Sequence, residues 1–323
     1  MKKFLPLFFG LWLAAAGARA LAETYQVAVI PKGTTDEYWK SIHAGAVQAQ
    51  RELKAAGVDV AIIWKGPLRE DDREQQVQVV ENFIGRQVSG IVLAPLDARA
   101  LVAPVEEAVG AHIPVVVIDS GLQSKLPASF VATDNREGGR LAARRLGEIL
   151  GGRGKVILLR YMVGSASTEE REEGFLEIMR RDFPGIALIS TEQHAGATRD
   201  AAKRAAENLL NRFGAEVTGV FASNESSASG MLLALRDAGL AGGKVKFVGF
   251  DASQALDQAL AAGDVQGLVV QDPVKMGYLG VKTLVAVLRG EKVPAEIATS
   301  VGVVTPENMN DPAQAALLHP SVE

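Results

Sequence analysis

The sequence predicts an α/β protein made of two lobes, each a doubly wound parallel sheet with helices on both faces. Short segments rich in Val and Ile recur along the chain and are apolar on both faces, as in parallel strands covered by helices. Amphipathic segments with helical spacing separate them. The 323 residues are enough for two domains that each bury a core of their own.

The predicted strands follow one another from residue 25 to residue 271. One sheet of ten or more strands is less favourable than two sheets of five or six. In chain order the predicted strands read YQVAVI, VDVAIIW, GIVLAP, IPVVVID, SFVAT, KVILLR, IALIS, VTGVFAS, VKFVGFD and VQGLVVQ.

Predicted helices alternate with these strands, which favours parallel sheets with right-handed crossovers. Glycines such as Gly57, Gly214 and Gly290 mark several helix ends. The helical segments span Tyr38–Ala56, Asp71–Gly85, Ala98–Ala111, Glu137–Leu150, Thr168–Asp182, Arg199–Phe213, Ser226–Ala238 and Val274–Arg289. The charged run Arg69–Gln76 is interpreted as a solvated helix start.

The first 22 residues have the pattern of a secretory signal peptide. Lys2 and Lys3 precede a short apolar core, and small residues follow it. We expect cleavage after Ala22, with Ala20 as the alternative, and a mature protein in the periplasm. Removing Lys2, Lys3 and Arg19 changes the net charge from −4 to −7. An acidic exported chain is a poor candidate for binding nucleic acid, and without cysteine it forms no disulfides.

Polar and aromatic side chains follow several predicted strands, where ligands bind in open α/β sheets. Carboxylates, amides and a guanidinium match sugar hydroxyls, and aromatic rings match the C–H face of a sugar. We therefore expect a polyhydroxylated ligand, no cofactor, no metal and no catalysis. The candidate ligand-binding residues are Lys32, Thr35, Asp36, Tyr38, Trp39, Asp119, Ser120, Arg171, Asn224, Asp251 and Gln271.

Several of these residues have a structural alternative. Asp119, Asn224 and Asp251 could each cap a following helix, and the two aromatics could belong to the core. Arg171 lies in EREE and could pair with neighbouring acids on a solvated helix face. Lys32 could be exposed to water.

The chain resembles periplasmic sugar-binding proteins of the ribose-binding type, the type I periplasmic binding proteins of ABC transporters. The resemblance covers essentially the whole mature chain and is carried by VIPKGTTDEYWKSIHAGA, VSGIVLAPLD, IPVVVIDS, FVATDN, EREEGF, VFASNESSASG, KFVGFD and LVVQDP. It implies that Tyr38 and Trp39 stack on a sugar. It also implies that Thr35, Asp36, Asp119, Arg171, Asn224, Asp251 and Gln271 contact its polar groups.

The resemblance also implies a three-crossing hinge with the ligand cleft between the lobes. We expect crossings near Thr133, Gln271–Pro273 and Val301. The N-terminal lobe would then comprise 23–132 plus 273–300, and the C-terminal lobe 133–272 plus 301–323. Two positions depart from the ribose pattern: Ser120 replaces an arginine, and Ala197 replaces an aromatic of the second lobe. Another residue, such as Trp64, could then stack on the ligand.

The function expected from this resemblance is that of a monomeric receptor that delivers a monosaccharide-like ligand to an inner-membrane ABC transporter permease. A ligand-sensing subunit for a chemoreceptor or sensor kinase remains an alternative, as does binding of a sugar acid or another polyol derivative. A repressor would need an N-terminal helix-turn-helix where the signal peptide stands. The HExxH and GxSxG motifs of hydrolases are absent from the sequence.

Overall fold

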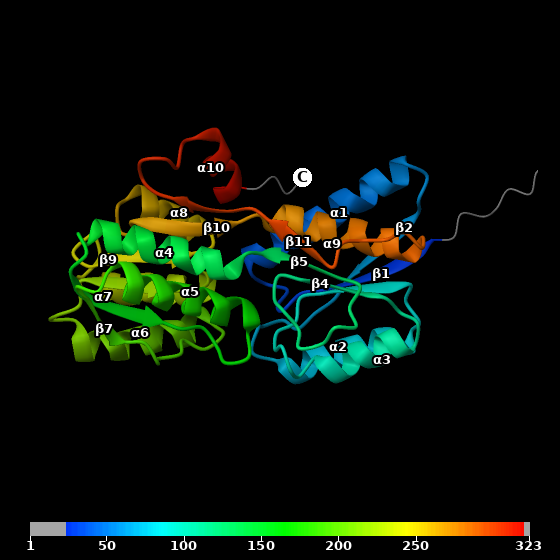
Figure 1. Ribbon diagram of the computed structural model, residues 1–323, viewed down its shortest axis with the longest axis horizontal. Helices are drawn as coiled ribbons and strands as arrows, with labels where there is room; N and C mark the ends of the chain where they lie inside the picture. Colours follow the sequence, from blue (N-terminus) through cyan, green and yellow to red (C-terminus); the bar gives the residue numbers. More distant parts are fainter. Residues whose placement is uncertain (1–23, 320–323) are drawn as a thin grey trace, which may run out of the picture.

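A computed structural model describes residues 24–319, which form two lobes that lie side by side (Figure 1). Each lobe contains one six-stranded sheet with helices on both faces. The α/β class and the two doubly wound lobes predicted from the sequence are thereby confirmed. The predicted signal peptide lies outside the described residues.

The sheet of the N-terminal lobe is entirely parallel. Alternate residues of β1 enter different cores: Val27 and Val29 pack under α1 and α9, whereas Ala28 and Ile30 pack under α2 and α3. In spatial order the strands are β11 (Glu296–Thr299), β5 (Ser129–Thr133), β4 (Val115–Ile118), β3 (Gly90–Leu93), β1 (Tyr25–Ile30) and β2 (Val60–Trp64). The helices are α1 (Glu37–Ala55), α2 (Arg73–Gly85), α3 (Val102–Gly110) and α9 (Pro273–Leu288).

The sheet of the C-terminal lobe has the same design with one antiparallel edge. Its strands, in spatial order, are β12 (Val301–Val304), β10 (Gly267–Gln271), β9 (Lys246–Phe250), β8 (Gly219–Ala222), β6 (Gly154–Leu159) and β7 (Ile186–Ser190). Two helices, α4 (Asn135–Ile149) and α5 (Ala166–Asp182), cover one face. The other face carries α6 (Arg199–Phe213), α7 (Glu225–Asp237), α8 (Gln254–Ala261) and α10 (Pro312–Leu318).

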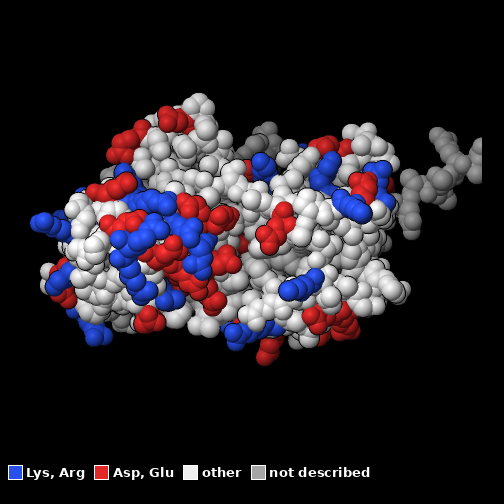
Figure 2. All heavy atoms as spheres, viewed as in Figure 1, with Lys and Arg blue, Asp and Glu red and all other residues white. Residues whose placement is uncertain are grey.

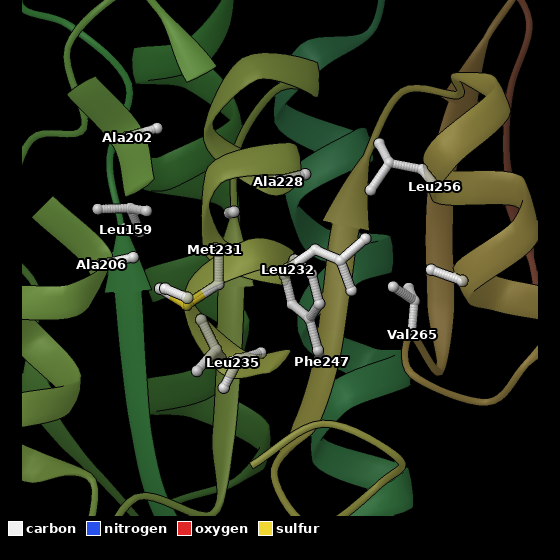
Figure 3. Close-up of a cluster of buried hydrophobic side chains, with 14 of the residues drawn as sticks. Leu159, Ala202, Ala206, Ala228, Met231, Leu232, Leu235, Phe247, Leu256 and Val265 are labelled. Atoms are coloured by element: carbon white, nitrogen blue, oxygen red, sulfur yellow. The ribbon is translucent and has the colours of Figure 1, made fainter. Parts of the chain in front are cut away.

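Figure 3 shows the apolar core beneath α7 in the C-terminal lobe. Met231, Leu232 and Leu235 descend from α7 onto the sheet. They lie between Ala202 of α6 on one side and Leu256 of α8 on the other. Burial on both sides of the sheet explains why these strands have continuous apolar sequences.

The structure adds four elements that the sequence did not indicate: α8, α10, β11 and β12. Only Ser300 separates β11, which pairs with β5, from β12, which pairs with β10 in the other sheet. The C-terminal sheet is parallel except at this edge, where β12 runs antiparallel to β10.

The chain passes between the lobes at three points that lie close to one another in the fold. β5 is followed by α4 after Thr133, β10 is followed by α9 after Gln271, and β11 is followed by β12 after Thr299. Two of these passages therefore lead directly into the long helices α4 and α9.

Glycines bring two helix pairs into backbone contact. A Cβ added to Gly139 of α4 would lie 1.8 Å from the carbonyl oxygen of Arg171 on α5. One added to Gly277 of α9 would lie 2.0 Å from the carbonyl oxygen of Ile42 on α1. Only glycine permits such close approach. These contacts fix α5 against α4, and α9 against α1.

The outer face of α4 and α5 carries interleaved positive and negative side chains (Figure 2). Arg140 lies 3.0 Å from Glu177, and Arg144 lies 2.7 Å from Glu137. Such exposed pairs contribute little stability individually, and they keep this face solvated. Among residues 24–319, no helix combines the length and apolar character that crossing a bilayer requires.

Candidate functional site

A pocket lies between the lobes, where the carboxyl ends of both sheets face each other. Side chains from both lobes line it, which is the arrangement expected for a ligand site in such sheets. The lining comprises Lys32, Asp36, Tyr38, Trp39, Glu70, Asp119, Tyr161, Ser167, Thr168, Arg171, Asn224, Glu225, Ser226, Asp251 and Gln271. The structure therefore brings together all the candidate residues except Thr35 and Ser120.

The loop after β1 presents Tyr38 and Trp39 on the first turn of α1. The two rings pack edge to face, with centroids 5.0 Å apart and planes at 86°. Each ring is also held at its polar end by a carboxyl group. The Tyr38 hydroxyl donates to Asp119 Oδ1 at 2.8 Å, and the Trp39 indole donates from Nε1 to Glu70. Burial and the Asp119 charge raise the pKa of Tyr38, which stays neutral.

Lys32 is buried, so the expectation of a solvated lysine is wrong. Its Nζ lies 2.8 Å from Asp119 Oδ2 and donates to Ser167 Oγ at 3.2 Å. The lysine and the aspartate belong to one lobe and the serine to the other. A desolvated cation requires such a counter-ion, and the charge of Lys32 is consequently already compensated within the protein.

Asp119 and Asp251 follow β4 and β9 at equivalent positions in the two lobes. Both have left-handed backbone conformations, with φ of 65° and 67°. Neither caps a helix: no helix begins directly after Asp119, and the N-cap of α8 is Ser253. Asp251 accepts a hydrogen bond from Gln271 Nε2 at 2.6 Å. Burial raises the pKa of Asp251, while Arg171 opposes the shift.

Arg171 points into the pocket from α5 and is 2% exposed. Its Nε donates to Asn135 Oδ1 at 2.9 Å and its Nη1 to the Ser223 carbonyl at 3.1 Å. The guanidinium also lies 3.8 Å from the centroid of the Phe250 ring. Its acidic sequence neighbours have other partners: Glu172 pairs with Arg160 at 3.1 Å, and Glu173 pairs with Arg136.

Asn224 caps a helix, which was the structural alternative for this residue, and it also lines the pocket. It is the N-cap of α7, where its Oδ1 accepts from the Ser227 amide at 3.2 Å in a capping box. Its Nδ2 donates to Ser226 Oγ at 3.0 Å.

Thr35 and Ser120 do not line this pocket. Thr35 is exposed and donates to the Leu68 carbonyl at 3.1 Å, at the rim of the cleft. Ser120 is fully buried, and its Oγ accepts a hydrogen bond from the Ser167 amide at 3.1 Å, which joins the two lobes.

Six lining residues were not among the candidates: Glu70, Tyr161, Ser167, Thr168, Glu225 and Ser226. Tyr161 follows β6 and is 1% exposed, and it brings an aromatic ring from the C-terminal lobe. Glu70 lies in the charged run that was interpreted as solvated; it is half-buried in the cleft, and desolvation raises its pKa to about 7. Its carboxyl accepts from both Trp39 and Tyr161. Helix α2 begins within this run, at Arg73, and Asp72 is its N-cap.

Trp64 does not reach the pocket, so the expectation that it could stack on a ligand is wrong. Its ring stacks on His43 with centroids 4.6 Å apart, and it lines a surface hollow formed with α2. Ala197 lies at the rim of the cleft. The aromatic contribution of the second lobe comes from Tyr161.

The central pocket is nearly closed in this arrangement of the lobes. The side chains leave a cavity of about 30 Å³, which is room for about two water molecules. A larger cavity of about 460 Å³ lies beyond Tyr38, Asp251 and Gln271, between α1, α8 and α10. The central pocket is the stronger candidate because most of its wall consists of convergent polar groups from both lobes.

The pocket contains five carboxyl groups and two cations. The cations, Lys32 and Arg171, both have carboxylate neighbours, at 2.8 Å for Asp119 and 3.8 Å for Asp251. Such a wall presents many hydrogen-bond acceptors and a few donors beside flat aromatic faces. It can bind a hydroxyl-bearing ring. The described residues 24–319 contain no cluster of three or more side chains suited to a metal ion.

The chain matches a protein family and is similar to proteins of known function. Residues 27–292 match the family described as periplasmic binding protein domain. The ribose import binding protein RbsB of Haemophilus influenzae is 29% identical over 305 residues, which cover 94% of this chain and 100% of that protein. The D-ribose/D-allose-binding protein of Pseudomonas aeruginosa is 29% identical over 293 residues, 88% of this chain and 89% of that protein.

Solved structures show the same similarity. A carbohydrate transporter solute-binding protein from Agrobacterium radiobacter, in complex with D-arabinose, is 36% identical with a TM-score of 0.85. The match covers 92% of this chain and 99% of that one. An ABC transporter solute-binding protein from Agrobacterium vitis with bound D-fucose is 34% identical, with a TM-score of 0.85 and coverage of 91% and 100%.

Proposed function

Because this chain belongs to the periplasmic binding protein domain family, as a sugar-binding protein of the ribose type, we propose that it captures a monosaccharide and delivers it to an ABC transporter. The family consists of substrate-binding proteins of transporters rather than enzymes. We further propose that the protein acts in the periplasm, after removal of residues 1–22, and that its partner is an inner-membrane permease.

One observation carries the proposal: the polar strand ends of both lobes converge on a single pocket with aromatic walls. Trp39 and Tyr161 bring aromatic side chains to the pocket from opposite lobes. Asp119 and Asp251 offer acceptors, and Arg171 offers donors. This combination matches a ring that carries both C–H faces and hydroxyls that each donate and accept.

The charges of the pocket favour a neutral sugar over a sugar acid. Lys32 was the basis for considering an anionic ligand, and it is paired with Asp119 at 2.8 Å. An added carboxylate would face five carboxyl groups, and each of the two lining cations already has a carboxylate neighbour. Desolvating a further negative charge there would be costly.

We propose that ligand entry and release use a hinge at the three passages after Thr133, Gln271 and Thr299. A cavity of about 30 Å³ cannot admit a sugar ring, so the lobes must separate. Separation would break contacts such as Lys32 to Ser167, and Ala98 N to the Gly164 carbonyl at 2.9 Å. In this proposal residues 23–132 plus 273–300, and 133–272 plus 301–323, move as units.

The proposal is tested by thermal unfolding of the purified mature protein with D-ribose, D-arabinose, D-allose, D-fucose and D-tagatose. D-Glucuronate serves as the anionic comparison. A neutral sugar should raise the melting temperature because it binds only the folded state, and it should be recovered chemically unchanged. If no sugar raises the melting temperature, or if the recovered ligand has been converted, the proposed function is incorrect.

A further inference from the structure

The carboxyl group of Glu70 lies between aromatic side chains of both lobes. One oxygen accepts from Trp39 Nε1 in the N-terminal lobe, and the other accepts from the Tyr161 hydroxyl in the C-terminal lobe. Both aromatic residues are almost completely buried, at 2% and 1% exposure. Buried indole and phenol groups need hydrogen-bond partners, and here they share one.

The surrounding loops are built to place this carboxyl group. A Cβ on Gly33 would lie 3.1 Å from Glu70 Cγ and 3.7 Å from Trp39 Cδ1, so Gly33 lets the two side chains pass closely. Thr34 Oγ1 donates to the Pro67 carbonyl at 3.1 Å, which ties the loop after β1 to the loop that carries Glu70. Glu70 is therefore held in position from both loops.

We propose that Glu70 is a positioning residue of the sugar site: it fixes the plane of the Trp39 ring and, through Tyr161, couples that orientation to closure of the lobes. The inference rests on the proposed function, because it assigns a role within the same pocket. When the lobes separate, Tyr161 leaves with the C-terminal lobe. Trp39 and Glu70 remain together, and the carboxyl group becomes hydrated.

Closure should consequently depend on pH. Burial raises the pKa of Glu70 from 4.5 to about 7, and Lys32, Tyr161 and Trp39 lower it in part, while Asp36 raises it. A carboxyl whose pKa is higher in the closed state takes up a proton on closing. The closed state is therefore most favoured below about pH 4.5, and this advantage is lost as the pH rises through 7. Asp251 also has a raised pKa, so only the part that depends on Glu70 is diagnostic.

The experiment compares wild type and Glu70→Gln in a Trp64→Phe background. Trp39 is then the only tryptophan of the mature chain, because the third tryptophan is Trp12. Its fluorescence is followed from about pH 5 to pH 8.5 without ligand. Affinity for D-arabinose is measured over the same range by calorimetry. The amide of Gln can still accept from the indole but does not titrate near neutrality.

The expected fluorescence titration in wild type has a midpoint near pH 7 and is absent in Glu70→Gln. Affinity in wild type should fall by about three- to tenfold between pH 6 and pH 8, and Glu70→Gln should remove most of this dependence. Glu70→Ala, which leaves the indole N–H without an acceptor, should shift the emission of Trp39 in a way that Glu70→Gln does not.

The control variant is Asp257→Asn. Burial and the charge of Glu37 raise the pKa of Asp257 to about 7 as well, but this residue lies on α8 outside the central pocket. A titration that persists in Glu70→Gln, or that disappears in Asp257→Asn, overturns the assignment. If wild type binds no sugar at any pH, the proposed function fails, and the fluorescence titration still decides whether Glu70 governs Trp39.

Discussion

Replacing Gly139 with alanine should damage both the fold and the sugar site through one contact. The new Cβ would lie 1.8 Å from the carbonyl oxygen of Arg171, whereas ordinary contacts begin near 3.4 Å. Helices α4 and α5 would have to separate by the difference, 1.6 Å. The obstacle is backbone and not the tip of a side chain. We therefore expect the free energy of unfolding to fall by about 3 kcal/mol, the upper end of the usual cost of overpacking.

The same displacement should weaken ligand binding, because Arg171 is attached at the point of contact. Its guanidinium depends on hydrogen bonds of 2.9 Å to Asn135 and 3.1 Å to the Ser223 carbonyl. A shift of this size breaks at least one of them. Losing a hydrogen bond to a charged group costs about 1.5–3 kcal/mol, and we expect an affinity loss of that order.

Urea unfolding measures the first effect and calorimetric titration with the sugar measures the second. Gly85→Ala is the matched control: Gly85 is also in a helix, and an added Cβ would meet no atom within 4 Å. That variant should be about 0.5–1 kcal/mol more stable than wild type and should bind normally. A Gly139→Ala protein that unfolds and binds like wild type would refute the reasoning.

Three further variants probe the cleft. Trp39→Ala should lower affinity by about 2–4 kcal/mol through loss of a ring face, measured by calorimetry; unchanged binding would show that the residue serves only packing. Gly164→Ala should weaken binding because its φ is +94° and the new Cβ would lie 2.2 Å from Asp97 Oδ2 across the closed cleft. Scattering with and without sugar should show a more open protein, and normal closure would contradict this. Lys32→Met leaves Asp119 desolvated without its cation and should reduce affinity for a neutral sugar by about 3–5 kcal/mol, whereas affinity that improves would exclude Lys32 as a counter-ion.

Much of the fold was predictable because both faces of each sheet are buried. The apolar runs that became β1, β3, β4 and β8 are visible as hydrophobic segments for this reason. By contrast, β11 and β12 are edge strands with partly exposed residues, and their apolar signal is weak. The short helix α8 was likewise hidden between two well-marked strands.

The candidate pocket residues were predictable where they follow strands, because a strand end fixes the position of the next few residues. Asp119, Asp251 and Gln271 are examples. Glu70 was missed because it lies six residues beyond β2 in a run of charges. It is half-buried and accepts a hydrogen bond from Tyr161 of the other lobe, a contact between distant parts of the chain that no local pattern reports.

The glycine contacts between α4 and α5, and between α1 and α9, make each helix pair a rigid unit that extends away from the passages between the lobes. Both α4 and α9 begin directly after a passage between the lobes, and each contacts its partner helix backbone to backbone. Stiff arms leave bending to the few residues at the passages. Helices of 15 and 16 residues extend about 22–24 Å, so a rotation of about 30° at the proposed hinge would move their far ends by roughly 12 Å. Fluorescent labels at Glu148 and Arg289, at those far ends, would read a small angular change as a large change in distance.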